Sequence, residues 1–258
     1  MVKENLGILL SLCSKNQNWT NVGDLDLFKV FIPSFYNTIS NKYNYKFFIG
    51  YDDDDKFIID NLDKIKKRLR NVSTITELKG CKGNPCNAWN ILLKENVNNA
   101  DYFYQVGTDI HLITKNWDDY FIRLLKKNNN LGICSSTEMV FWNERLCNNQ
   151  NGIAENILFH KTHYNIFKTL FNPKFKNWFS DDYISQLYYS IDKCFICGFV
   201  NFRNTHRVWQ QKLNRYEPDV SIQHEWKDLV NEDKKKLFNY VITHDKKKLK
   251  NYFENKKV

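Results

Sequence analysis

Short apolar runs alternate with amphipathic stretches through the first half of this chain. The apolar runs predict four strands, at residues 6–11, 45–50, 72–78 and 101–106. The stretches between them carry apolar residues at helical spacing, which predicts helices at residues 26–39, 58–69 and 86–95. This order of elements is typical of an α/β domain with a mostly parallel central sheet and helices on both faces.

The second half of the chain is less regular. It predicts a strand at residues 131–135 and a helix over residues 181–188 with Ser180 as its N-cap. We expect a single domain over residues 1–230 and a basic, helical tail over residues 231–258. Ligands of parallel sheets bind beyond the carboxyl ends of the strands, so residues that follow strands are the first site candidates.

Composition limits the class of protein. The apolar fraction of 42% supplies a substantial core, and polar residues interrupt each apolar run well before a membrane-spanning length. Glu4 beside Lys3, ahead of the first run, favours a core strand over a secretory signal, so we expect a cytoplasmic chain. The odd number of cysteines, seven, lacks the spacing of a secreted disulfide framework and predicts reduced thiols.

The formal net charge of +9 suggests an anionic partner, such as a nucleic acid, a membrane surface or a phosphorylated small molecule. Much of this charge lies in the tail, where Leu237, Phe238, Val241 and Ile242 share a helical face opposite lysines. Such a helix can dock on the body of the protein or make a peripheral contact with an anionic membrane. No recognised motif interleaves the basic residues with aromatics, so we expect no specific nucleic-acid partner.

Asp109 stands at the tip of the strand that begins at residue 101, directly after Gly107 and Thr108. A carboxylate at the edge of a core is costly unless it is paired or binds a metal ion. An aspartate that caps the turn after a strand is the structural alternative.

Two further groups of acids follow predicted elements. Residues 52–55 are four consecutive aspartates after the second strand, and Asp52 is the first of them. Asp181 and Asp182 begin a predicted helix, where the helix dipole alone favours acids. The chain has no glycine-rich phosphate loop and no GxGxxG motif, which argues against a P-loop kinase or a Rossmann dehydrogenase.

Seven short segments, three of which contain these acids, occur in an informative order. They lie at residues 47–52, 89–90, 101–110, 117, 131–133, 161–167 and 177–182. In this order they resemble the nucleotide-sugar glycosyltransferases of the GT-A fold. The resemblance runs from the first strand to Tyr216 and excludes the tail. That family carries an Asp-x-Asp motif at a strand tip, and Gly107-Thr108-Asp109 keeps only its final acid.

The resemblance implies a divalent cation, Mn²⁺ or Mg²⁺, that bridges the two phosphates of the donor and has Asp109 as a ligand. A late histidine often completes the ligands in that family, and His206 is the candidate here. A hard cation stabilises the charge that develops on a leaving nucleoside diphosphate. Thr108 is then expected to contact the ribose or a metal-bound water.

The same resemblance implies the donor contacts and a division of the domain. Residues 1–115 form the nucleotide-sugar-binding half and residues 116–230 the acceptor and catalytic half. Asp52 is expected to bind the base or ribose, and Asn90 to meet the donor. His163 is expected to contact donor phosphate or acceptor, and Arg215 to pair with the diphosphate.

In inverting members of the family, a carboxylate at the position of Asp181 and Asp182 takes the proton from the acceptor hydroxyl. We favour Asp182 as this general base, with Asp181 close behind. An inverting reaction is therefore expected.

The leading hypothesis is a metal-dependent hexosyl- or N-acetylhexosaminyltransferase. It would move a sugar from a nucleoside diphosphate, with UDP favoured, to a hydroxyl of a glycan, a protein or a small acceptor. A catalytically degenerate protein that binds nucleotide or glycan is the first alternative, because Thr108 replaces an acid. A nucleic-acid-binding protein is the second alternative and rests on charge and aromatic content alone.

Overall fold

The structure is a computed structural model that describes residues 3–15, 17–69, 73–142, 145–149, 152–177, 179–205 and 232–255. Its strands are β1 (Asn5–Leu12), β2 (Asn44–Asp52), β3 (Ser73–Leu78), β4 (Tyr102–Gly107), β5 (Ile110–Leu112), β6 (Ile133–Trp142), β7 (Arg145–Asn149), β8 (Ile157–His160) and β9 (Cys194–Asn204). Its helices are α1 (Ile32–Thr38), α2 (Lys56–Asp60), α3 (Leu62–Leu69), α4 (Pro85–Asn96), α5 (Trp117–Lys127), α6 (Thr162–Phe167), α7 (Ser180–Tyr189) and α10 (Glu232–Asn255). Two short helical turns, η1 (Val22–Asp24) and η2 (Leu27–Phe31), precede α1.

One sheet contains all of these strands, in the order β3-β2-β1-β4-β8-β6-β9-β5, with β7 paired to β6. The strands β3, β2, β1 and β4 are parallel to one another, as the sequence predicts. Beyond β4 the sheet is mixed, because β8 is antiparallel to both β4 and β6, whereas β6 and β9 are parallel. The predicted α/β class is therefore confirmed, with its parallel part in the N-terminal half.

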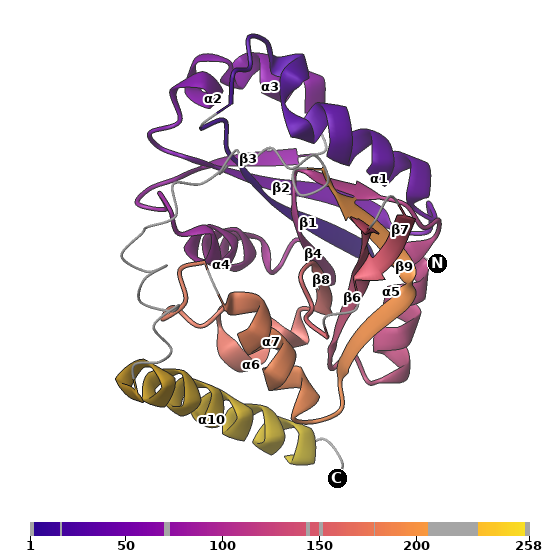
Figure 1. The fold of residues 1–258 in the computed structure, drawn as a ribbon, viewed down its shortest axis with the longest axis vertical. Coiled ribbons are helices and arrows are strands. Elements are labelled where there is room, and N and C mark those ends of the chain that lie inside the picture. Colours follow the sequence, from indigo (N-terminus) through magenta and orange to yellow (C-terminus); the bar gives the residue numbers. More distant parts are fainter. Residues whose placement is uncertain are drawn as a thin grey trace.

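Helices cover both faces of the sheet (Figure 1). On one face, an apolar cluster joins β1 and β4 to η2, α1, α3 and α5, and contains Phe31, Phe35 and Phe121. On the other face, a second cluster joins the sheet to α4, α7 and α10, and contains Leu92, Ile184 and Leu249. These two layers account for the core that the apolar composition predicts.

The helix expected over residues 26–39 is present as the π-helical turn η2, which runs directly into α1, and Pro33 lies just after their junction, in the first turn of α1. One local prediction needs correction. The predicted N-cap at Ser180 is wrong, because α7 begins at Ser180 and its N-cap is Phe179. The Ser180 hydroxyl instead donates to the carbonyl of Asn177 at 2.7 Å.

Helix α10 docks on the body of the protein, against α6 and α7 (Figure 1). Val241, Ile242 and Leu249 are buried in this contact. The buried carboxylate of Asp245 accepts hydrogen bonds from the hydroxyl of Tyr183 at 2.7 Å and from the side chain of Asn172 at 2.8 Å. Docking, one of the two expectations for the tail, is confirmed. Contact with an anionic membrane through the outward lysines of α10 stays a prediction, which flotation with anionic liposomes would test.

Three further predictions concern the cysteines, membrane-spanning helices and the boundary between the domain and the tail. The six cysteines whose side chains are described are free thiols, as predicted. Within the described part of the chain, no helix is both long enough and apolar enough to cross a membrane. The boundary at residue 230 falls among residues 206–231, which lie outside the described residues, so the division into domain and tail stays a prediction.

We predict that Leu249→Ala destabilises the whole protein by about 2–5 kcal/mol, because the side chain is completely buried between α10 and the body. Urea unfolding measures the loss. Lys250→Ala, an exposed neighbour on the same helix, is the matched control and should change the free energy of unfolding by less than about 0.5 kcal/mol. Equal effects of the two variants would show that α10 is not part of the cooperative unit.

Candidate functional site

The carboxyl ends of the parallel strands bring two of the predicted acids to one edge of the sheet. Ser11 of β1 is aligned with Gly50 of β2 and with Gly107 of β4. Asp52 and Asp109 each follow their glycine by two residues. The sequence prediction that both acids lie at this edge is therefore confirmed.

Asp109 lies in the turn between β4 and β5, and only 7% of its surface is exposed. Its backbone carbonyl accepts hydrogen bonds from the N–H and the hydroxyl of Thr205, at 3.1 and 2.9 Å, which ties the strand tip to the end of β9. Its carboxylate folds back over Gly107, where a Cβ atom would lie 2.5 Å from Oδ1. The glycine is therefore needed for this position of the carboxylate.

A pocket of about 230 Å³ lies beside Asp109. It is lined by three acidic residues, Asp109, Glu155 and Asp181, and by four residues with carboxamides, Gln105, Asn156, Asn177 and Asn204. Trp89, Gly107, Ile110 and Ser180 complete its wall. The pocket thus combines acids, amides and an aromatic ring, the mixture expected of a site for a polar small molecule.

The N-terminus of α7 contributes one of the two predicted acids to this pocket. Asp181 lines it, whereas Asp182 is not among the described lining residues. Asp182 is half-buried, and this burial raises the pKa of its carboxyl group above the usual range. A carboxyl group with a raised pKa holds a proton more readily after taking it from a substrate.

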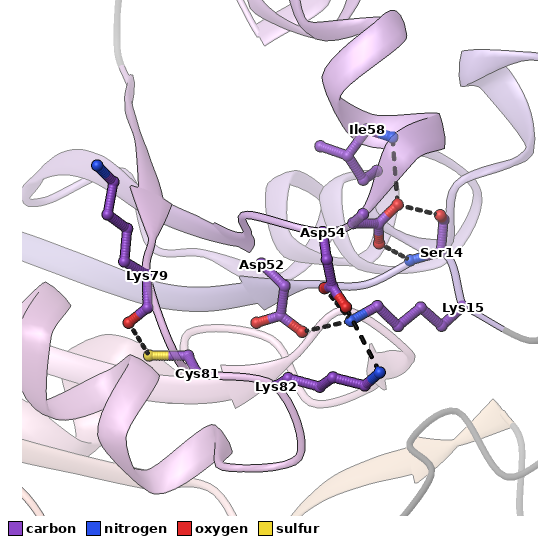
Figure 2. A network of polar contacts seen from close by, with 9 residues as sticks. Ser14, Lys15, Asp52, Asp54, Ile58, Lys79, Cys81 and Lys82 are labelled. Atoms are coloured by element: carbon purple, nitrogen blue, oxygen red, sulfur yellow. Dashed lines mark hydrogen bonds and ion pairs between the residues drawn. The ribbon is translucent and has the colours of Figure 1, made fainter.

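Figure 2 shows a second group of acids, in a network with lysines beyond the end of β2. The ammonium of Lys15, from the loop after β1, lies 3.2 Å from the Asp52 carboxylate and also pairs with Asp54. Lys82 pairs with Asp54 at 3.6 Å. Burial raises the pKa of Asp52, while the hydrogen bond from Lys15 holds the pKa of Asp54 below its usual value. The edge therefore holds the half-buried carboxylate of Asp52, paired with Lys15, and a second lysine, Lys82, at the neighbouring Asp54.

Asp55 has a different role from its neighbours. It is almost fully buried, and its carboxylate accepts hydrogen bonds from the backbone N–H of Ser14 at 2.7 Å, from the Ser14 hydroxyl and from the N–H of Ile58 at 3.2 Å. It is the N-cap of α2 and fixes the loop after β1 to that helix. The two hydrogen bonds from Ser14 to Asp55 also position Lys15, the next residue in the chain.

Asn90 and His163 are buried away from the pocket, and hydrogen bonds occupy their polar atoms. The Asn90 side chain accepts from the backbone N–H groups of Leu170 and Phe171 at 2.8 and 2.9 Å, and donates to the Phe171 carbonyl at 2.9 Å. The His163 ring meets the Tyr188 hydroxyl at 2.7 Å and the Leu170 carbonyl at 3.0 Å. These bonds give both residues a structural role in holding residues 170–171, and their contacts with a donor stay predictions.

The remaining predicted residues are those expected around the metal ion and the diphosphate. Thr108 is buried in the turn beside Asp109. His206 and Arg215 lie outside the described residues. Among the residues that the structure describes, no three His, Cys, Asp or Glu side chains gather in a way that could hold a metal ion. A cation bound at this edge would take the carboxylate of Asp109 as a ligand and complete its coordination with substrate phosphates and water, as Mg²⁺ commonly does.

Several residues of the site were missed at the sequence level. Gln105 had a visible signal, because it is a polar residue inside the apolar run Tyr-Phe-Tyr-Gln-Val. Lys15, Glu155 and Asn204 had no such signal, since each lies beside a strand end and meets the site only through the sheet order.

No protein-family model matches this chain, and no curated protein is similar enough in sequence to match it. Solved structures do share its fold. The crystal structure of S. aureus TarS 1-349 in complex with UDP-GlcNAc superposes with a TM-score of 0.55 at 9% identity, over 77% of this chain and 58% of that one. The structure of GalNAc-T7 with UDP, GalNAc and Mn²⁺ superposes with a TM-score of 0.60 at 9% identity, over 84% of this chain and 45% of that one. This likeness confirms the predicted GT-A-like fold, and the chain spans less than two thirds of either structure.

We predict that His163 makes the protein less stable in mild acid. Burial lowers the pKa of its imidazole to about 4, from 6.5 in an exposed ring. The unfolded chain therefore binds a proton first as the pH falls below 6.5, and the folded state loses about 2 kcal/mol by pH 5 on this account.

Urea unfolding of the wild type and of His163→Gln at pH 7 and pH 5 measures this effect. The variant should be less stable at pH 7 because it loses packing and hydrogen bonds, but its stability should fall less between the two pH values. All other titrating groups are common to both proteins. The same fall in both would show that His163 is not held neutral.

Proposed function

We propose that this protein is a glycosyltransferase that moves a sugar from a nucleoside diphosphate, with UDP as the favoured nucleotide, to a hydroxyl of an acceptor. One observation carries the proposal. On a fold shared with structures that contain UDP and UDP-GlcNAc, a polar pocket lies at the carboxyl edge of the sheet, directly beside the strand-tip carboxylate of Asp109. Ligands of open α/β sheets bind at this edge.

The proposed donor lies along the edge from β2 to the pocket. Asp52 is suited to accept a hydrogen bond from the base or ribose, because burial and a single lysine leave its carboxylate poorly solvated. Lys15 and Lys82 supply positive charge for the diphosphate. The pocket then receives the sugar, between Asp109 and the N-terminus of α7.

The reaction needs one proton transfer and one exchange of bonds. The acceptor oxygen forms a bond to the anomeric carbon while the bond from that carbon to the diphosphate oxygen breaks, and the diphosphate leaves with the electron pair. A carboxylate of α7 takes the proton of the acceptor hydroxyl. Asp181 is supported by its place in the pocket wall, and Asp182 by its raised pKa. A bound Mn²⁺ or Mg²⁺ would stabilise the charge on the departing diphosphate, with Asp109 as its protein ligand.

The second candidate is a protein that binds nucleotide or glycan without transferring a sugar. Thr108, a buried residue that cannot act as a carboxylate ligand, favours this candidate, as does the absence of a three-ligand cluster among the described residues. In this case UDP binds with an affinity that Mn²⁺ does not change, and no donor is turned over.

We predict that Asp109→Asn lowers sugar transfer or UDP-sugar hydrolysis by about a hundredfold or more, because the proposal makes this buried carboxylate a ligand of the cation at the strand tip. Release of UDP from a panel of UDP-sugars, with Mn²⁺ or Mg²⁺, measures the rate. Calorimetry of UDP with and without Mn²⁺ measures the coupling between the two.

Asp53→Asn is the matched control, since Asp53 is an exposed acid at the same edge and should leave the rate unchanged. An unchanged rate in Asp109→Asn would remove Asp109 from the mechanism. UDP binding that ignores Mn²⁺, together with no turnover in the wild type, would replace the transferase by the second candidate.

We predict that one of the variants Asp181→Asn and Asp182→Asn loses about a hundredfold or more in kcat while still binding UDP, because a general base contributes this much to a proton transfer. In the wild type, kcat should rise with pH as the base loses its proton and then level off. The variant that lacks the base should lose this rise. If both variants keep most of the rate, α7 does not supply the base.

A further inference from the structure

Asp245 occupies a buried position on the docking face of α10. Val241 and Leu249 lie about one helical turn before and after it and are buried apolar residues of the same face. Only 4% of the Asp245 surface is exposed. A face that served docking alone would be apolar here, because an apolar residue in place of a buried charge is often neutral or stabilising. The acid therefore needs an explanation beyond docking.

One oxygen of this carboxylate joins two places in the chain. Oδ2 accepts a hydrogen bond from the Tyr183 hydroxyl at 2.7 Å and another from the Asn172 amide at 2.8 Å. The other oxygen, Oδ1, faces side chains of α10 itself, with Nδ1 of His244 at 3.2 Å and Nζ of Lys248 at 3.9 Å. A single atom of α10 thus binds both Asn172 and Tyr183.

Asn172 and Tyr183 stand at the two ends of a stretch of chain that forms part of the pocket wall. We call residues 172–177 and 179–183 the wall segment. Three residues of the wall segment line the pocket beside the strand tip, namely Asn177, Ser180 and Asp181. The Asp245 carboxylate therefore holds both ends of the chain that carries these three side chains.

Aromatic packing makes a second connection between α10 and the wall segment. The Phe175 ring lies 4.8 Å from the Tyr183 ring and 5.7 Å from the ring of Phe238, a residue of α10. Between these anchors, Phe179 has a φ of 64°, in the left-handed region. A residue keeps such a conformation only where the surrounding structure holds it. The conformation of the wall segment thus depends on contacts from outside it.

We propose that Asp245 is a positioning residue, which holds the pocket wall, and with it the acids at the start of α7, in the arrangement that the transfer reaction needs. This inference rests on the proposed function. It assigns a part in the reaction to α10, which lies outside the sequence resemblance to glycosyltransferases. A displacement of about 1 Å in a reacting group can slow a reaction by up to about a hundredfold. The donor nucleotide is proposed to lie along the edge from β2, so UDP binding should depend much less on Asp245.

Steady-state kinetics of UDP-sugar turnover with Mn²⁺, together with calorimetry of UDP, tests the proposal on the full chain. Asp245→Ala should lower kcat by about tenfold or more and change the affinity for UDP by about twofold or less. Tyr183→Phe keeps the ring but loses the hydroxyl, and should lower kcat by about threefold or more. Asp245→Asn keeps an acceptor oxygen and should recover most of the rate that Asp245→Ala loses.

Ile122→Ala is the matched control for stability. Ile122 is completely buried in α5, in the apolar cluster on the opposite face of the sheet, so its truncation weakens the fold without removing a contact to Asp245. It should keep the wild-type kcat at a temperature where circular dichroism shows every variant to be folded. An equal loss of kcat in Ile122→Ala and Asp245→Ala would overturn the proposal. A wild-type kcat in both Asp245→Ala and Tyr183→Phe would overturn it as well.

Hydrogen exchange supplies a readout that needs no activity. In Asp245→Ala and in Tyr183→Phe, backbone amides of the wall segment should exchange faster relative to those of β4 than they do in the wild type. Unchanged exchange in the wall segment would show that Asp245 does not hold it, and would overturn the inference while the proposed function stands. If the wild type turns over no donor, the proposed function fails, and the exchange result alone decides whether Asp245 positions the wall.

Discussion

The position of β1 in the sheet determines where chemistry can occur in this protein. β1 is paired with a parallel strand on each edge and is buried on both faces, with Ile8 and Leu10 in one apolar cluster and Leu9 in the other. A strand in this setting cannot carry polar side chains in its interior without an energetic cost. The polar residues of β1, Asn5 and Ser11, therefore stand near its ends, and the parallel register brings the ends of β1, β2 and β4 to one edge.

Carboxylates at this edge are stabilised in three different ways. Asp55 is nearly fully buried and receives three hydrogen bonds, so it serves the fold. Asp52 and Asp54 share Lys15, but burial outweighs this pairing at Asp52 and raises the pKa of its carboxyl group. Asp109 depends on the missing side chain of Gly107, which allows the carboxylate to fold back over the strand. Asp52, Asp54 and Asp55 are thus neighbours in sequence but differ in role, because different hydrogen-bond donors meet their carboxylates.

The alternation of apolar runs and amphipathic stretches was enough to predict the parallel half of the sheet, its helices and the edge that holds Asp52 and Asp109, because these depend on local periodicity and strand order. The pocket could not be predicted in this way. Gln105, Asn156 and Asn204 come from strands or strand ends far apart in the chain, and they meet only because β4 lies next to β8 and because β9 ends beside β5. The hydrogen bonds of Asn90 and His163 to backbone around residue 170 could not be predicted from spacing either.

The backbone at the start of α7 explains why the N-cap prediction for Ser180 was wrong. Residues with a left-handed backbone cost about 1–2 kcal/mol when they carry a large side chain, yet Phe179 has a φ of 64° at the N-cap. Its ring packs against the apolar cluster under α4 and α7, and burial of such a ring contributes a comparable free energy. Because Phe179 takes the N-cap position, the Ser180 hydroxyl bonds to Asn177 rather than capping the helix. Asn177, Ser180 and Asp181 all line the pocket. The backbone strain stands at Phe179, the residue whose ring anchors this segment in the core.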